Sequence, residues 1–221
     1  MAPSRRAWIV ACACAETVGM TASAGAARLV DSRPSWPLVV ALGVIVVGGL
    51  VEGVALGWGQ ARVLAGRLPA LVPRRYLVAT VVVAGLGWAA ASSPSVLSRD
   101  QPTGPEPAMW LVLLGAAGIG LAMGPLLGAA QAWALRGAAR RPARWILANT
   151  LAWPVVMVVV FVGATSPDAG WSTGAVLLIG AVTGAVAGTV LGLLTTPFLP
   201  VPAGPVGGVE GMRATVVGVD P

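Results

Sequence analysis

Three hydrophobic segments of this chain carry a glycine at every fourth position. The nine glycines are Gly49, Gly53 and Gly57; Gly120, Gly124 and Gly128; and Gly184, Gly188 and Gly192. Residues four apart lie on one face of an α-helix, so each segment would present a stripe without side chains, where a second helix can approach closely in lipid. We therefore interpret the stripes as helix-packing surfaces, and a special pore lining is the less favoured alternative.

The composition indicates a lipid environment. Hydrophobic residues make up 57% of the 221 residues and charged residues only 10%, which leaves too little polar surface for a soluble domain of this length. The net charge of +6 comes from arginines that cluster beside the hydrophobic segments and do not form a solvated stripe. We expect the lipid bilayer, and no nucleic acid, as a partner.

Six segments are long enough to cross a membrane, since a helix needs about 20 apolar residues to span a hydrocarbon core of about 30 Å. We expect helices near residues 7–27, 37–63, 76–92, 108–135, 145–165 and 172–199. The fold class is therefore predicted to be all-α, a polytopic membrane bundle of six transmembrane helices.

The charges of the connections indicate an orientation. Arginines are concentrated near residues 5–6, 62–75 and 136–144, whereas the other connections hold Asp31, Asp100, Glu106 and Asp168. Because cytoplasmic loops carry the excess of basic residues, both termini are expected in the cytoplasm, in the inner membrane of a bacterium. Most tryptophans fall near the helix ends, where we expect them at the membrane interfaces; these are Trp8, Trp58, Trp133, Trp145, Trp36, Trp88, Trp110 and Trp171.

A larger repeat surrounds each glycine stripe. Three residues after its last glycine stands Gln60, Gln131 or Thr195. Each odd-numbered helix opens with an arginine one or two residues before an aromatic residue, which is Trp8, Tyr76 or Trp145. These patterns predict three tandem two-helix repeats near residues 5–64, 74–136 and 143–199, within one transmembrane domain of residues 1–199. Pseudo-threefold packing is the natural arrangement, and an asymmetric pairwise one stays open.

Residues 200–221, rich in proline and glycine, are predicted to be a flexible cytoplasmic tail.

The G-x3-G-x3-G-x2-Q run and the arginine-aromatic helix start resemble those of a loose group of uncharacterised polytopic membrane proteins from bacteria. The resemblance covers most of residues 5–199. It implies a repeated helical membrane domain and brings no activity and no functional residue with it.

The chain contains few residues of the types that commonly catalyse reactions or bind metals. The chain has no histidine, and Cys12 and Cys14, two residues apart, would point to different faces of a helix. No phosphate-binding loop with a lysine is present. We therefore expect no metal, no cofactor, no catalytic residue and no enzymatic activity.

Two acidic residues lie deep in the predicted first repeat. Glu16 stands ten residues after Arg6, and Glu52 stands ten residues before Arg62, so each lies about 15 Å from the arginine level. Intramembrane ionisable groups usually face a protein interior or a wet cavity. We interpret Glu16 and Glu52 as candidates for proton or cation handling, with a hydrogen bond between helices as the alternative.

Further polar residues are candidates for a path through the bundle. Cys12 and Ser23 share a helix face with Glu16, and Asn149 could contribute to a cavity, although tying helices together is its plainer role. Gln60 and Gln131 are expected to bond neighbouring backbone or loop arginines. Pro125 and Pro154 interrupt the fourth and fifth helices near mid-depth and are expected to be tolerated kinks or bending points.

Two functions remain from different classes. The first is a small inner-membrane permease or ion-handling protein that uses Glu16 and Glu52. The second is a noncatalytic scaffold or accessory subunit, acting as a homo-oligomer or in a larger membrane complex, which the three packing stripes would suit.

We predict that the amino terminus is retained. Residues 4–9 resemble a twin-arginine export motif and residues 23–26 a cleavage site, but the same basic-aromatic opening recurs before the third and fifth helices. Terminal sequencing of the membrane-purified protein should therefore find residues preceding Arg5. A terminus near Ala26 would remove the first helix and contradict the six-helix prediction.

Overall fold

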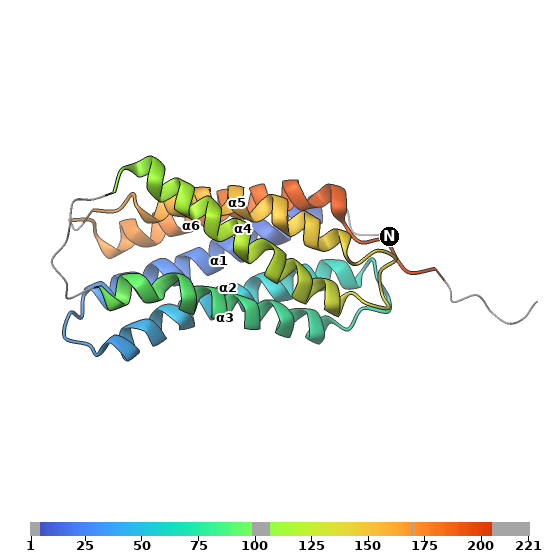
Figure 1. Cartoon of the computed structure of the whole chain (residues 1–221), viewed down its shortest axis with the longest axis horizontal. Coiled ribbons are helices and arrows are strands. Elements are labelled where there is room, and N and C mark those ends of the chain that lie inside the picture. Colours follow the sequence, from blue (N-terminus) through green and yellow to red (C-terminus); the bar gives the residue numbers. More distant parts are fainter. Residues whose placement is uncertain (1–4, 99–106, 169, 205–221) are drawn as a thin grey trace, which may run out of the picture.

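The computed structural model describes residues 5–98, 107–168 and 170–204, and these form six long α-helices that run along one axis (Figure 1). Their bounds are α1 (Arg5–Asp31), α2 (Leu38–Ala65), α3 (Pro73–Leu97), α4 (Met109–Ala134), α5 (Arg144–Ala164) and α6 (Thr173–Thr195), with a short 3₁₀-helix η1 (Thr196–Phe198) after α6. All six are long and apolar enough to cross a membrane. The predicted all-α class is confirmed, and so are six helices that are able, by length and composition, to span a membrane. The chain is compatible with a multi-pass integral membrane protein.

Helix α3 is longer than the expected 76–92. It begins at Pro73, where a proline is tolerated because the first turn has no intrahelical partner for its missing N–H. It also continues past Pro94, and the hydroxyls of Ser93 and Ser98 donate to carbonyls of the last turns, at 2.5 Å to Ala89 and 2.8 Å to Pro94. Helix α3 therefore continues to Leu97, beyond the end that hydropathy alone placed near residue 92, and these serine hydroxyls are satisfied by its own carbonyls.

The helices surround a common centre in chain order, and α6 returns to pack against α1 (Figure 1). Helices α6, α1, α2 and α3 pack extensively on one another in that order, and α4 packs extensively on α5. The α3–α4 contact is the thinnest of the six, followed by α5–α6. The bundle thus consists of two parts. Helices α6, α1, α2 and α3 form the first, which we call the α6–α3 body, and helices α4 and α5 form the second, which we call the α4–α5 pair.

Each glycine stripe lies against the backbone of a neighbouring helix: α2 on α3, α4 on α5, and α6 on α1. A Cβ atom added at Gly124 would lie 2.6 Å from the carbonyl oxygen of Asn149, and one at Gly188 would lie 2.7 Å from Cα of Ala13. Gly49 differs, because the atoms nearest to it belong to the indole side chain of Trp88. No residue larger than glycine fits at these positions without moving the neighbouring helix or ring.

The two ends of the bundle differ in charge. At the arginine-rich end lie the start of α1 and the α2–α3 and α4–α5 connections, and Leu64, Leu68 and Leu135 are buried there. The chain after η1 also folds onto this end: Arg140 N–H donates to Val201 O at 3.1 Å, and Ala203 N–H to Ala138 O at 2.9 Å. The extension that we expected to begin at residue 200 is therefore tied to the bundle as far as Ala203, while residues 205–221, like Asp100 and Glu106, lie outside the described residues.

The tryptophans differ in exposure, and Trp36, Trp88 and Trp171 are partly buried. Trp58, Trp110 and Trp133 are 60%, 65% and 54% exposed, as interfacial rings should be. Trp8 and Trp145 are fully buried, so the interface interpretation was wrong for these two.

Two glycines of α4 allow a direct test of the packing. Gly124→Ala should destabilise the bundle by about 1–3 kcal/mol because the added methyl group meets the backbone of α5. Gly118→Ala is the matched control, since nothing lies within 4 Å of the Cβ position. Unfolding in detergent, followed by circular dichroism, would measure both; equal stabilities of the two variants would contradict the packing described.

Candidate functional site

One kind of hydrogen-bonded pair recurs three times near the arginine-rich end. The donor of the hydrogen bond is an aromatic side chain at the start of an odd-numbered helix. The acceptor lies on the neighbouring helix that carries a glycine stripe, three residues after the last glycine of that stripe. The pairs are Trp8 Nε1 to Thr195 Oγ1 at 2.9 Å, Tyr76 OH to Gln60 Oε1 at 2.9 Å, and Trp145 Nε1 to Gln131 Oε1 at 2.8 Å. All six side chains are buried.

The last glycine of each stripe explains why these pairs form. Cβ atoms at Gly57, Gly128 and Gly192 would lie 3.2, 2.7 and 2.8 Å from Cα of Leu77, Ile146 and Ile9, each of which directly follows the aromatic residue. The glycine therefore brings the two backbones together beside the ring. A side chain three residues further along lies on the same helix face and reaches the ring N–H or O–H.

The two glutamines also join the pairs to each other. Gln131 Nε2 donates to Gln60 Oε1 at 3.2 Å and to Thr80 Oγ1 at 3.0 Å, and Gln60 Nε2 donates to Cys12 Sγ at 3.6 Å. Our expectation that the glutamines bond backbone or loop arginines was therefore wrong. Buried amides are costly unless they are hydrogen-bonded, and here they bond one another.

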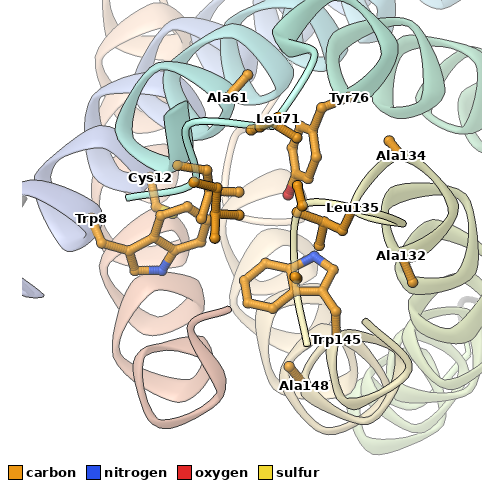
Figure 2. Close-up of a cluster of buried hydrophobic side chains, with 14 residues drawn as sticks. Trp8, Cys12, Ala61, Leu71, Tyr76, Ala132, Ala134, Leu135, Trp145 and Ala148 are labelled. Atoms are coloured by element: carbon orange, nitrogen blue, oxygen red, sulfur yellow. The ribbon is translucent and has the colours of Figure 1, made fainter. Parts of the chain in front are cut away.

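We call this set the closing layer; it consists of Trp8, Gln60, Tyr76, Thr80, Gln131, Trp145 and Thr195. The rings of Trp8, Tyr76 and Trp145 reach from three helices toward the middle of the bundle (Figure 2). Trp8 and Trp145 meet edge to face, with ring centroids 5.5 Å apart and planes at 76°. Together with the buried leucines next to it, the closing layer fills the centre of the bundle at the arginine-rich end.

A central cavity of about 690 Å³ begins where the closing layer ends. All six helices line it, and Thr80, which belongs to the closing layer, is one of its deepest residues. At the opposite end of the bundle it is lined by Arg28, Asp31 and Asp168, and both aspartates are exposed. The cavity is therefore blind at the arginine-rich end and reaches the surface at the other.

Glu52 lies in the wall of this cavity, halfway along α2, and is 8% exposed. Trp88 Nε1 donates to its Oε2 at 3.1 Å. The side chain packs against Gly19 of α1, where an added Cβ would lie 2.8 Å from Cα of Glu52. Glycine at position 19 is thus what allows a carboxyl group to stand between α1 and α2.

Glu16 is buried behind Glu52, with 1% of its surface exposed, and does not line the cavity. The two carboxyl groups are close enough to interact electrostatically. Within the described part of the chain, Glu16 Oε1 has no hydrogen-bond partner, and neither has the hydroxyl of Ser23, which lines the cavity. The structure thus brings together Glu16, Glu52 and Ser23 from the predicted site residues.

Cys12 and Asn149 are placed elsewhere. Cys12 accepts the bond from Gln60 at the closing layer. Asn149 Nδ2 donates to Trp145 O at 2.9 Å, and its Oδ1 accepts from Trp153 Nε1 at 3.0 Å, so its amide is used within α5. Neither residue lines the cavity, and the polar face of Cys12, Glu16 and Ser23 is not a continuous path.

The two prolines expected at kinks lie within unbroken helices. Helix α4 continues through Pro125 and α5 through Pro154. A Cβ at Gly120 would lie 2.6 Å from Cα of Pro154, so this proline stands where α4 packs most closely on α5. Neither proline lines the cavity.

The partner of Glu52 is the residue that sequence reasoning missed, since Trp88 was expected at a membrane interface. From the level of Tyr76 and Gln60, Trp88 lies about 18 Å along α3 and Glu52 about 12 Å along α2. Helical side chains lean toward the N-terminus, and in these antiparallel helices the two lean toward each other. Aligning α2 and α3 in the sequence at the level of Gln60 and Tyr76 would therefore have predicted the contact between Glu52 and Trp88.

The geometry holds no metal cluster: no group of three histidine, cysteine, aspartate or glutamate residues suited to one ion occurs in residues 5–98, 107–168 and 170–204. No protein-family model, no curated protein and no solved structure matches this chain.

The closing layer can be tested with two tryptophans near the same end. Trp145→Phe should lower the unfolding temperature by several degrees, because Gln131 loses a buried donor worth about 1 kcal/mol. Trp133→Phe, at an exposed ring, should change it little. Thermal unfolding of the two variants in detergent provides the comparison, and equal melting temperatures would show that the Trp145 bond contributes nothing.

Proposed function

We propose that this chain is a small membrane permease that handles a proton or cation at Glu16 and Glu52. The observation that supports it is the cavity, because all six helices line it, it is blind at one end, and an acidic side chain stands in its wall at mid-depth. Ligand sites of transporters typically lie near the bilayer midplane between helices that move relative to each other.

The packing suggests how the blind end opens. The α6–α3 body and the α4–α5 pair meet through the two thinnest helix contacts, α3–α4 and α5–α6. Two of the three aromatic pairs lie wholly inside the α6–α3 body and the third lies inside the α4–α5 pair. Rocking of one body against the other therefore leaves all three pairs intact.

Such rocking separates only a few contacts of the closing layer. These are the bonds from Gln131 to Gln60 and Thr80, and the edge contact of Trp8 with Trp145. Hydrogen bonds between membrane helices are worth about 0.6 kcal/mol on average, so their loss is small beside the free energy of folding. The glycine-packed helix pairs act as rigid units in this mechanism.

Orientation and location complete the proposal. The arginine-rich end would face the cytoplasm, because basic residues are retained there, and the cavity would then open to the outside of a bacterial inner membrane. We also propose that the chain consists of three tandem two-helix repeats, as in the proteins that its motifs resemble. The three aromatic pairs and the three glycine stripes support this proposal.

The scaffold alternative loses its main support. It was motivated by three close-packing stripes and by the absence of a recognisable substrate motif. The central glycines Gly53, Gly124 and Gly188 all face helices of the same chain, so the stripes do not require a partner chain. Enlarging them would disturb this bundle first.

Ion-linked flux in reconstituted vesicles tests the permease proposal. Vesicles loaded with a pH-sensitive dye would be exposed to sodium, potassium and tetraphenylphosphonium chloride. At least one salt should change the internal pH faster than in protein-free vesicles. Glu52→Gln and Glu16→Gln should each reduce that rate by about tenfold or more, since a buried charged group contributes roughly 1.5–3 kcal/mol to an interaction.

Cys14→Ser is the control, because Cys14 is exposed on α1 and does not line the cavity. It should keep the rate of the unmodified protein. Rates that do not differ between the unmodified protein and both glutamate variants would remove the basis of the proposal, as would the absence of any response to all three salts.

A further inference from the structure

We propose that the ligand of the cavity is a bulky organic monocation, whose positive charge is surrounded by aryl or alkyl groups. This inference rests on the proposed function and specifies its substrate class. It is drawn from the walls of the cavity, the charges along it and the surroundings of Glu52.

The walls of the cavity suit a large apolar ligand. The volume of about 690 Å³ lies within the range of about 300–1,000 Å³ that is typical of small-molecule sites. Aromatic rings and methionines from four helices line it, namely Trp88, Trp153, Phe161, Met20, Met123 and Met157. Methionine side chains are flexible and polarisable, so they adapt to ligands of irregular shape.

The charges along the cavity favour a cation. Three carboxyl groups line it, those of Asp31, Glu52 and Asp168, against one guanidinium, that of Arg28. The cavity is thus acidic although the chain as a whole has a formal charge of +6. An anionic ligand would meet three like charges on the way to the closing layer.

At mid-depth, no arginine among the described residues that line the cavity lies beside Glu52. Arg28 stands nine residues beyond Gly19 on α1, about 13 Å along the helix from the level of Glu52. Its Nη2 donates to Trp171 O at 3.0 Å, at the open end. A cation that enters the cavity would therefore be the counter-ion that the described residues do not supply.

Trp88 connects the charge with the apolar wall. Its N–H bond to Glu52 fixes the indole ring beside the carboxyl group. A cation drawn to Glu52 would also approach an aromatic ring, and cation–π attraction is strongest for tryptophan. Ser23, buried with an unpartnered hydroxyl in the same wall, supplies a further polar contact.

A metal ion fits this site poorly. Such ions need several oxygen ligands in place of their hydration shell, and Glu52 and Ser23 in the wall, with Glu16 behind Glu52, are too few. An organic cation is weakly hydrated and buries apolar surface against the walls. The size of the cavity and the one deep carboxyl group that lines it, that of Glu52, therefore point to the same class of ligand.

Equilibrium binding of two probes to the full chain in phospholipid nanodiscs tests the inference. Tetraphenylphosphonium carries a shielded positive charge, and triphenylphosphine oxide is a neutral compound with similar aryl groups. With binding to empty nanodiscs subtracted, the cation should bind at least about tenfold more tightly than the neutral probe, because only the cation interacts with the charge of Glu52.

Glu52→Gln should bring the affinities for the two probes within about threefold of each other, because it weakens the binding of the cation alone. The amide oxygen of glutamine can still accept the Trp88 bond, so the fold should be kept. Glu52→Asp should retain part of the preference, and Cys14→Ser all of it. Equal affinities in the unmodified protein, or a preference that survives in Glu52→Gln, would overturn the inference and assign the cavity to neutral or lipid ligands.

Binding and flux separate the two proposals. Selective binding of the cation without any flux in vesicles would keep this inference and remove the permease function. Flux of inorganic ions that depends on Glu52, with no binding of tetraphenylphosphonium, would keep the permease function and remove the organic cation.

Discussion

The close approach of helix backbones at glycine is the constraint on which the rest of the structure depends. In lipid, helices gain little from burying apolar side chains, so association depends on van der Waals contact and on polar bonds between helices. Each stripe provides the van der Waals contact. At its end, the stripe also positions a polar bond between the two helices. Gly57, Gly128 and Gly192 bring a backbone beside an aromatic residue, and the side chain three residues on accepts its hydrogen bond. One spacing in the sequence thus determines both how three helix pairs pack and where the bundle is closed.

The distribution of contacts explains why a cavity coexists with such close packing. Glycine draws helices together in pairs, but the α3–α4 contact lacks a stripe and is thin. Long side chains in the centre, including Trp88 and Met123, hold the remaining walls apart without filling the space between them. At the arginine-rich end, in contrast, three large rings pack in the centre among buried leucines (Figure 2). The amides of Gln60 and Gln131 are buried beside them. The same six helices are therefore solid at one end and hollow at the other.

Much of this architecture could be predicted from the sequence. Hydropathy and length give six helices, and the spacing of glycines gives the helix faces that meet a neighbour. The depth of Glu16 and Glu52 follows from counting residues. Rotation of the helices without a glycine stripe, α1, α3 and α5, does not follow, because apolar residues occur on most of their faces. For that reason Trp8 and Trp145 were assigned to the membrane interface, although they lie in the core. The cavity was beyond prediction for the same reason, since a void depends on six rotations and on side-chain lengths together.

Gly49 shows how an absent side chain can control a charge. The indole of Trp88 occupies the space that a Cβ atom would need at this position, and its N–H then reaches Glu52, one helical turn away on α2. Any larger residue at position 49 would displace the ring and leave the carboxylate without that donor. Selection on the electrostatics of Glu52 would therefore also act on Gly49, a position that has no functional atom of its own.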